Sequence, residues 1–155
     1  MYYFAYGSNL NVEQMKARCP SAIIMGTAYL QDHRLAFRGS KTGAYLTVIP
    51  SKGDSVPIGV WDIDEADLRS LDRYEGYPTF YDRKEIELQC YLNDWTPSFT
   101  ARGVIYIMTG NRQPGIPSER YLEVCRHGYK DFEFSVGPIT EAYEEAEREV
   151  GCLAV

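Results

Sequence analysis

Residues 4–10, FAYGSNL, place a glycine and two polar residues directly after an aromatic, apolar run. Gly7 can reach a positive φ without steric cost, and Ser8 and Asn9 can bond back to nearby backbone. A strand that turns here and continues into a helix can point several backbone N–H groups into one space, which suits a carboxylate or an oxyanion. An ordinary strand-to-helix turn has the same pattern, and geometry alone favours that simpler interpretation.

Glu75 is a second candidate for chemistry because of its place on a predicted helix, Glu65–Glu75. Leu68 and Leu71 form the apolar stripe of that helix, and Glu75 follows Leu71 by four residues, on the same inward face. Partial desolvation there raises the pKa of a carboxyl and makes it a stronger base when ionised. The alternative is a helix-end glutamate that turns into solvent or pairs with Arg83. The helical pattern leaves both interpretations open.

Other chemically active residue types form no comparable cluster in the sequence. Cys125 and His127 stand two apart on a predicted helix, so their side chains diverge, which disfavours a thiol hydrolase. His33 is alone in a predicted strand, and two histidines without an acidic cluster argue against a catalytic metal. None of the four cysteines lies in a Cys-x-x-Cys pair, which favours scattered thiols in a reducing compartment.

Composition and charge narrow the class of protein. With 155 residues, 45% of them hydrophobic, the chain suits one domain, residues 1–155, with its own core. A net charge of −6 argues against nucleic acid and against an anionic membrane as partners. No signal peptide or membrane span is visible, so we expect a cytoplasmic protein. The 13 tyrosines indicate that some buried hydroxyls line a polar pocket.

Strand-forming segments dominate the first two thirds of the chain. They are Met1–Tyr6, Ile23–Phe37, Tyr45–Ile49, Pro57–Ile63, Tyr81–Leu92 and Phe99–Met108. Residues that favour turns separate them or follow the last one. These connections are a hairpin loop at Gly39–Gly43, turns at Pro50–Asp54 and Asn93–Pro97, and a loop at Gly110–Pro117.

Four helices are predicted from capping residues and apolar periodicity. They start after Asn11, Asp64, Ser118 and the pair Gly137-Pro138. Gly76 ends the second of them in a left-handed conformation. Because about six strands come first and two helices come last, the order indicates an α+β fold. Short strands in one small domain can close into a barrel.

Two sequence motifs at a characteristic separation resemble the γ-glutamylcyclotransferase/AIG2-like family. The first is FAYGSNL at residues 4–10, and the second is LDRYEGYP at residues 71–78, followed by Tyr81. The resemblance covers nearly the whole chain. It continues through RCP at 18–20, LTVIP at 46–50, GVWD at 59–62 and PSERY at 117–121.

The resemblance implies a fold, a reaction and a set of site residues. The fold is a small mixed barrel with flanking helices, and the reaction cleaves a γ-glutamyl amide into 5-oxoproline and a free amine without metal or cofactor. Glu75 matches the family's acid–base glutamate. The residues that match the γ-glutamyl-binding loop are Tyr6, Gly7, Ser8, Asn9 and Leu10, and two pocket tyrosines match Tyr81 and Tyr121.

A small-molecule γ-glutamyl substrate follows from this resemblance, and neither nucleic acid nor a membrane is expected as a partner. The substrate's own α-amine is the nucleophile, so one base that takes and returns protons can suffice. The alternative is a non-catalytic module that uses the loop as a receptor for an acyl or carboxylate group. The sequence does not identify the leaving amine or the oligomeric state.

Overall fold

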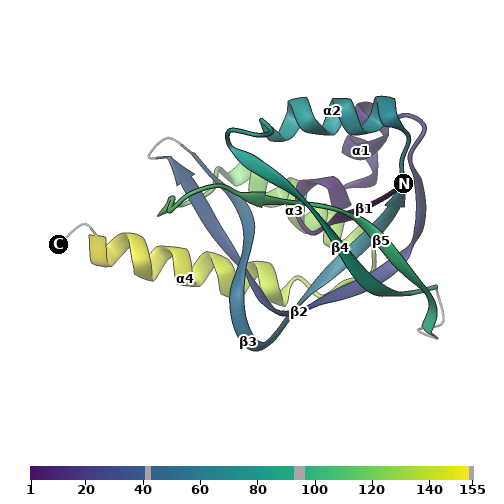
Figure 1. The fold of residues 1–155 in the computed structure, drawn as a ribbon. Coiled ribbons are helices and arrows are strands. Elements are labelled where there is room, and N and C mark those ends of the chain that lie inside the picture. Colours follow the sequence, from purple (N-terminus) through teal and green to yellow (C-terminus); the bar gives the residue numbers. More distant parts are fainter. Residues whose placement is uncertain (41–42, 93–96, 154–155) are drawn as a thin grey trace.

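Five strands close into a barrel at the centre of the protein, whose computed structural model describes residues 1–40, 43–92 and 97–153 (Figure 1). Around the ring the order is β3, β1, β5, β4 and β2, and β2 pairs with β3 to close it. The bounds are Tyr2–Ala5 for β1, Ile23–Ser40 for β2, Gly43–Asp62 for β3, Tyr81–Tyr91 for β4 and Pro97–Met108 for β5. A short strand β6, Gln113–Pro114, adds to β2.

The barrel is mixed because its first strand runs parallel to β5. Tyr2 pairs with Gly103 and Tyr3 with Val104, whereas the other strand pairings are antiparallel. Apolar side chains from different strands, such as Phe4 of β1 and Ile105 of β5, are fully buried in the common interior. The predicted α+β fold with a small mixed barrel is therefore confirmed.

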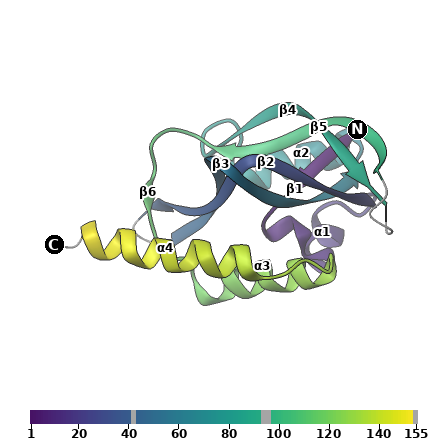
Figure 2. The same cartoon turned by 90° about the horizontal axis from the view of Figure 1, so that it is seen from below.

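In the described part of the chain, four α-helices and one short 3₁₀ helix surround the barrel. They are η1 (Ser8–Leu10), α1 (Val12–Arg18), α2 (Glu65–Glu75), α3 (Glu119–Asp131) and α4 (Gly137–Leu153). Figure 1 shows α2 across one end of the barrel, and Figure 2 shows α3 and α4 along another side. Among the described residues, no helix has the length and apolar character to cross a membrane.

The predicted helix caps are confirmed. The side chain of Asn11 accepts a hydrogen bond from the N–H of Gln14, and Ser118 caps α3 in the same way. Asp64 and Asp67 form a reciprocal capping box at the start of α2. Gly76 ends α2 with a φ of 66°, the left-handed conformation expected of it.

The Pro50–Asp54 segment is not the separate turn that its residue types predict, because it lies within β3. The register between β2 and β3 shifts around Asp32, which has a positive φ of 58°. Gly53 also has a positive φ, and its N–H donates to Asp32 Oδ1 at 3.0 Å. The turn-forming residues therefore produce an irregularity in a long strand pair. The predicted loop at Gly110–Pro117 likewise contains the short strand β6.

Two predicted turns fall partly or wholly outside the described residues. β2 and β3 pair up to Ser40 and Gly43, which confirms the hairpin at Gly39–Gly43, although residues 41 and 42 are not described. Residues 93–96 of the predicted turn Asn93–Pro97 also lie outside the described part, and β5 begins at Pro97.

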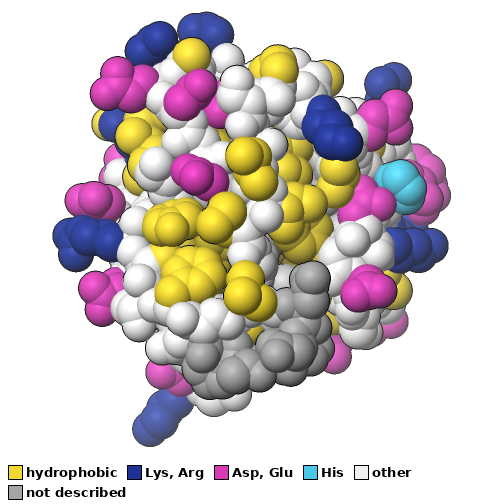
Figure 3. Space-filling model, turned by 90° about the vertical axis from the view of Figure 1, so that its right-hand side faces the viewer, with side chains coloured by type: hydrophobic (Ala, Val, Ile, Leu, Met, Phe, Trp, Pro, Cys, Tyr) yellow, Lys and Arg dark blue, Asp and Glu magenta, His cyan; other side chains and the backbone are white. Residues whose placement is uncertain are grey.

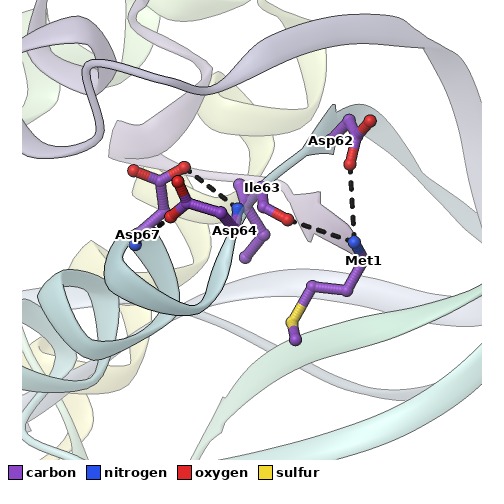
Figure 4. A network of polar contacts seen from close by, with 5 residues as sticks. All are labelled: Met1, Asp62, Ile63, Asp64 and Asp67. Carbon is purple, nitrogen blue, oxygen red and sulfur yellow. Dashed lines mark hydrogen bonds and ion pairs between the residues drawn. The ribbon is translucent and has the colours of Figure 1, made fainter.

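The chain start is joined to the junction between β3 and α2 (Figure 4). The ammonium group of Met1 donates to the carbonyl of Ile63 at 3.1 Å and to Asp62 Oδ1 at 3.4 Å. Figure 3 shows hydrophobic side chains gathered on the face of the molecule that carries this end, with charged side chains around them.

Candidate active site

A cavity of about 340 Å³ opens where α2, η1 and the barrel meet. Seven of the 13 tyrosines of the chain line it, as the abundance of tyrosine predicts. They are Tyr3, Tyr6, Tyr45, Tyr74, Tyr81, Tyr106 and Tyr121. Gly7, Ser8, Asn9 and Glu75 also line it, so the two sequence motifs meet in one cavity although more than 60 residues separate them.

Glu75, the last residue of α2, presents its carboxyl group to this cavity. Burial raises the pKa of that carboxyl from its ordinary value of 4.5 to about 7, and the nearby Arg18 opposes part of the rise. Arg83 forms its ion pair with Asp72, so pairing between Arg83 and Glu75 is not the arrangement. Glu75 is thus an inward carboxyl that can hold or release a proton near neutral pH.

Asp72 fixes the end of α2 that carries Glu75. It pairs with Arg83 of β4, and it accepts a hydrogen bond from the hydroxyl of Tyr106 on β5 at 2.6 Å. Because Asp72 lies three residues before Glu75, these two contacts hold the last turn of the helix against the barrel. The position of the Glu75 carboxyl is therefore set by rigid elements.

Asn9 is the polar centre of the loop that faces Glu75. Its side-chain nitrogen donates to Glu75 Oε1 at 3.3 Å and to the hydroxyl of Tyr3 at 2.9 Å. Its side-chain oxygen accepts from Arg18 Nη1 at 2.8 Å. Its backbone carbonyl accepts from Trp61 Nε1 at 3.1 Å. Four contacts from different elements therefore hold this buried residue in one orientation.

The loop itself differs from the expected turn at Gly7. Its φ is −128°, so the glycine is not there to reach a positive φ, and a 3₁₀ turn rather than an α-helix follows it. A Cβ at this position would lie 3.5 Å from Leu46 Cδ1 and 3.6 Å from the Tyr121 hydroxyl. Both of those residues line the cavity, so the glycine leaves space open at its wall.

Backbone N–H groups of the loop are available for a ligand. In the described part of the chain, no hydrogen bond has the N–H of Gly7, Ser8 or Asn9 as its donor. The first N–H groups of a 3₁₀ helix have no acceptor within the helix. Since all three residues line the cavity, a carbonyl oxygen or an oxyanion could accept from them.

Leu10 is placed differently from the other loop residues. Its side chain is fully buried, and its N–H donates to the carbonyl of Gly7 at 3.1 Å. It is absent from the residues that line the cavity, because the 3₁₀ turn directs it into the core beneath Gly128 of α3. Leu10 therefore supports the loop from behind.

Tyr81 and Tyr121 hold the same residue of β3 from two sides. The Tyr81 hydroxyl donates to the carbonyl of Leu46 at 2.6 Å, whereas the Tyr121 hydroxyl accepts from the N–H of Leu46 at 3.0 Å. The Tyr121 hydroxyl proton is therefore not used in this contact and can be donated elsewhere. Tyr6 donates its hydroxyl to the carbonyl of Tyr106 at 2.5 Å.

Several residues at the site were given no role from the sequence. Arg18 and Tyr74 lie within the matching motifs, whereas Tyr3, Tyr45 and Tyr106 lie outside them. All five come from different elements, and their meeting depends on the closed barrel. A tyrosine in an otherwise apolar strand is a signal that could have marked Tyr3 and Tyr106. Among the described residues, no group of three or more His, Cys, Asp or Glu side chains is arranged to hold a metal ion.

These features define a class: small mixed-barrel proteins whose cavity joins a buried carboxyl group of raised pKa to a loop with free backbone N–H groups. The chain belongs to the gamma-glutamyl cyclotransferase, AIG2-like family, whose sequence pattern matches residues 3–123. It is 36% identical over 137 residues to the human protein named gamma-glutamylcyclotransferase, covering 83% of this chain and 70% of that protein. The mouse protein of that name is 35% identical over 137 residues, with the same shares of the two chains covered.

A solved structure agrees with the sequence comparison. It is titled "Gamma-glutamyl cyclotransferase" and superposes with a TM-score of 0.74 at 30% sequence identity. The alignment covers 94% of this chain and 85% of that one. The similarity therefore includes the barrel and most of the surrounding helices.

Proposed function

We propose that the protein is a γ-glutamyl cyclotransferase that converts a γ-glutamyl amide into 5-oxoproline and a free amine. The observation that carries the proposal is the carboxyl of Glu75, which lines the cavity with a pKa of about 7 and faces the loop of residues 6–9. Family membership and the names of the relatives support the same activity.

Proton transfer by Glu75 starts the proposed reaction. The substrate's α-amine is an ammonium ion at neutral pH, and the carboxylate of Glu75 takes one of its protons. The amine nitrogen then attacks the γ-carbonyl carbon, and the new C–N bond closes a five-membered ring. Because nucleophile and carbonyl belong to one molecule, the protein needs mainly to fold the substrate into the attacking conformation.

Breakdown of the tetrahedral intermediate completes the reaction. The bond between the γ-carbon and the leaving nitrogen breaks as that nitrogen receives a proton from Glu75. Of the three protons on the original ammonium, one stays on the lactam nitrogen and two end on the amine, which departs as an ammonium ion. Glu75 is regenerated as a carboxylate, and no metal or redox cofactor takes part in this sequence.

The loop is the proposed receptor for the γ-glutamyl group. The N–H groups of Gly7, Ser8 and Asn9 would stabilise the oxyanion that forms on the γ-carbonyl oxygen. Tyr6 and Tyr81 would shape the cavity, and Tyr121 would donate its remaining proton to the substrate. Leu10 is left out of these contacts because it lies in the core.

A non-catalytic carboxylate receptor is the less favoured function. Such a module would gain affinity from a buried cation in the cavity. The arginine that lines this cavity, Arg73, is exposed, and the buried group is an acid that repels anions when ionised. A buried carboxyl with a raised pKa is instead typical of proton transfer. The four free cysteines support a reducing compartment, so we propose a cytoplasmic location.

The test is release of 5-oxoproline from a panel of γ-glutamyl amino acids and γ-glutamyl amines, followed by chromatography. Glu75→Gln should lower kcat/KM by roughly 10²–10⁴-fold and leave the circular dichroism spectrum unchanged, because the amide keeps the shape but cannot accept a proton in this way. Glu65→Gln, an exposed change on the same helix, is the matched control. Near-wild-type turnover by Glu75→Gln would exclude Glu75 as the base.

A further inference from the structure

We propose that Arg18 is a positioning residue for Glu75, because it fixes the side-chain amide of Asn9 with its nitrogen toward the Glu75 carboxyl. The role rests on the proposed function, in which Glu75 transfers the protons. Arg18 itself touches neither the reacting atoms nor the Glu75 carboxyl among the contacts of the described residues.

Three contacts hold the guanidinium of Arg18 in place at the end of α1. Nη1 donates to Asn9 Oδ1 at 2.8 Å, and Nη2 donates to Gln14 Oε1 at 2.6 Å. The guanidinium also lies over the ring of Tyr74, 3.6 Å from its centroid. Tyr74 in turn shares a hydrogen bond with Ser8 Oγ at 3.0 Å. Arg18 is therefore braced against α1, α2 and the loop at once.

The donor-only chemistry of arginine determines how the Asn9 amide is turned. A guanidinium has no acceptor, so the atom of Asn9 that faces Arg18 must be the oxygen. The amide nitrogen is then left to donate to Glu75 Oε1 and to the Tyr3 hydroxyl. With the amide reversed, its oxygen would face the Glu75 carboxylate and repel it. Arg18 thus selects the one orientation that stabilises an ionised Glu75.

The charge of Arg18 acts in the same direction as this hydrogen bond. It lowers the pKa of Glu75 against the rise that burial causes. The other titratable groups facing Glu75 are Tyr3, Tyr6, Tyr74, Tyr81, Tyr106, Tyr121 and Cys125. Burial raises the pKa of each of them, so all are neutral near pH 7. Among the described residues that line this cavity, the charged group besides Glu75 is Arg73, which is exposed and donates to Ser70 Oγ. Arg18 is the cation that lowers the pKa of Glu75.

The separation of Arg18 from Glu75 by one side chain has a chemical purpose. A direct arginine–carboxylate pair would hold Glu75 ionised and make it a poor proton donor to the leaving amine. The side-chain amide of Asn9, which lies between them, is oriented by Arg18 and donates a hydrogen bond to Glu75. Glu75 thus feels part of the charge of Arg18 without forming an ion pair with it. The arrangement lets Glu75 accept a proton and return it.

The experiment compares three variants of the full chain by nuclear magnetic resonance and by kinetics. In Arg18→Met, the pKa of Glu75 in the free protein, followed through its ¹³C carboxyl signal, should rise by roughly 0.5–1 pH unit. The side-chain NH₂ signals of Asn9 should shift, kcat should fall at least several-fold, and KM should change little. Lys16→Met, which removes an exposed cation from the same helix, should change none of these quantities.

Arg18→Lys separates charge from orientation. The pKa of Glu75 should stay near the wild-type value. The Asn9 NH₂ signals and kcat should still change, because an ammonium cannot reproduce the paired hydrogen bonds of the planar guanidinium to Asn9 and Gln14. Unchanged Asn9 signals in Arg18→Lys, or an unchanged Glu75 titration in a folded Arg18→Met, would overturn the proposal. If the wild type released no 5-oxoproline, the proposed function would fail, but the two spectroscopic measurements would still decide the role of Arg18.

Discussion

The carboxyl of Glu75 titrates near pH 7 in the folded protein but near its ordinary value of 4.5 when the chain is unfolded. Between these values the unfolded chain has released a proton that the folded chain retains, so raising the pH favours unfolding. Above pH 7 the folded protein holds a buried charge. The residue proposed for catalysis is therefore one that lowers stability at the pH where it would act.

Replacing Glu75 by glutamine should therefore increase the free energy of unfolding, and the increase should depend on pH. Glu75→Gln should unfold at a higher urea concentration than the wild type at pH 8, because the amide has no charge to bury. At pH 4 the wild-type carboxyl is protonated in the folded protein and mostly so in the unfolded one, so the difference should nearly vanish. Urea titrations at both pH values measure it, and a difference independent of pH would contradict the raised pKa.

The rate of 5-oxoproline release should depend on the same ionisation of the Glu75 carboxyl. Because the carboxylate form is the base, kcat/KM should fall as the pH drops below about 7, the pKa of Glu75 in the free protein. A bound ammonium next to Glu75 favours its ionised form, so the acidic limb of kcat should lie at lower pH than that of kcat/KM. An NMR titration of the free protein with a Glu75 pKa at or below 4.5 would show that burial does not control this group.

At this scale the sequence predicts what depends on near neighbours. Four residues from Leu71 to Glu75 make one helical turn, so an inward carboxyl could be foreseen. The contact between Arg18 and Asn9 could not be foreseen, because it forms only where the chain reverses direction between the two residues. The conformation of Gly7 was predicted wrongly, since the glycine provides space beside Leu46 instead of a positive φ.

Among the elements, α3 comes unusually close to the loop it supports. A Cβ on Gly128 would lie 2.4 Å from the backbone nitrogen of Asn11 and 2.6 Å from the carbonyl carbon of Leu10. Backbone atoms cannot yield as a flexible side chain does. The absence of a side chain at Gly128 therefore sets the distance between α3 and η1, and with it the position of Asn9.

Gly128→Ala should destabilise the protein by on the order of 1–3 kcal/mol, because the added methyl group forces α3 away from the loop. It should also lower activity, since η1 carries the proposed N–H donors. Gly151→Ala is the control, because nothing lies within 4 Å of a Cβ there and alanine favours a helix by up to about 1 kcal/mol. Equal urea midpoints for the two variants would refute the close packing of Gly128.

Helices were predictable where caps and periodicity agree, as the capping box of Asp64 and Asp67 illustrates. Strands were predictable as segments but not in their full length. The turn residues of Pro50–Asp54 indicated a break, yet β3 continues as one strand because its pairing with β2 stops at Pro50 and resumes at Ser55. Long-range pairing on both sides of the turn residues makes one long strand of them, and pairing with β2 also produces β6 from a segment that resembles a loop.

Across the whole molecule, the barrel and the candidate site share one set of contacts. Trp61 of β3 donates to the carbonyl of Asn9 and lies 5.8 Å, centroid to centroid, from the ring of Phe132, just beyond α3. Tyr129 of α3 donates to the carbonyl of Tyr6 at 3.0 Å. The loop is thus held by the barrel wall and by a helix that follows it by more than 100 residues.

The barrel and the candidate site should therefore unfold together in one cooperative transition. In a Trp95→Phe protein, which leaves Trp61 as the sole tryptophan, urea titrations followed by fluorescence and by far-ultraviolet circular dichroism should share one midpoint. Activity measured in the same urea series should fall with the same midpoint. Loss of activity at clearly lower urea would show that the site opens before the barrel does.

The parallel pairing of β1 with β5 affects how the chain is made. Tyr2 finds Gly103 only after about 100 intervening residues, and such distant contacts slow folding because a long loop must close before they form. At roughly 5–20 residues per second, a ribosome needs several seconds to synthesise that stretch. Until then β1, which leads directly into the N–H loop, can pair with β3 but not with β5. One of the two strand pairings that hold β1 in the barrel, at the entrance to the N–H loop, therefore forms late.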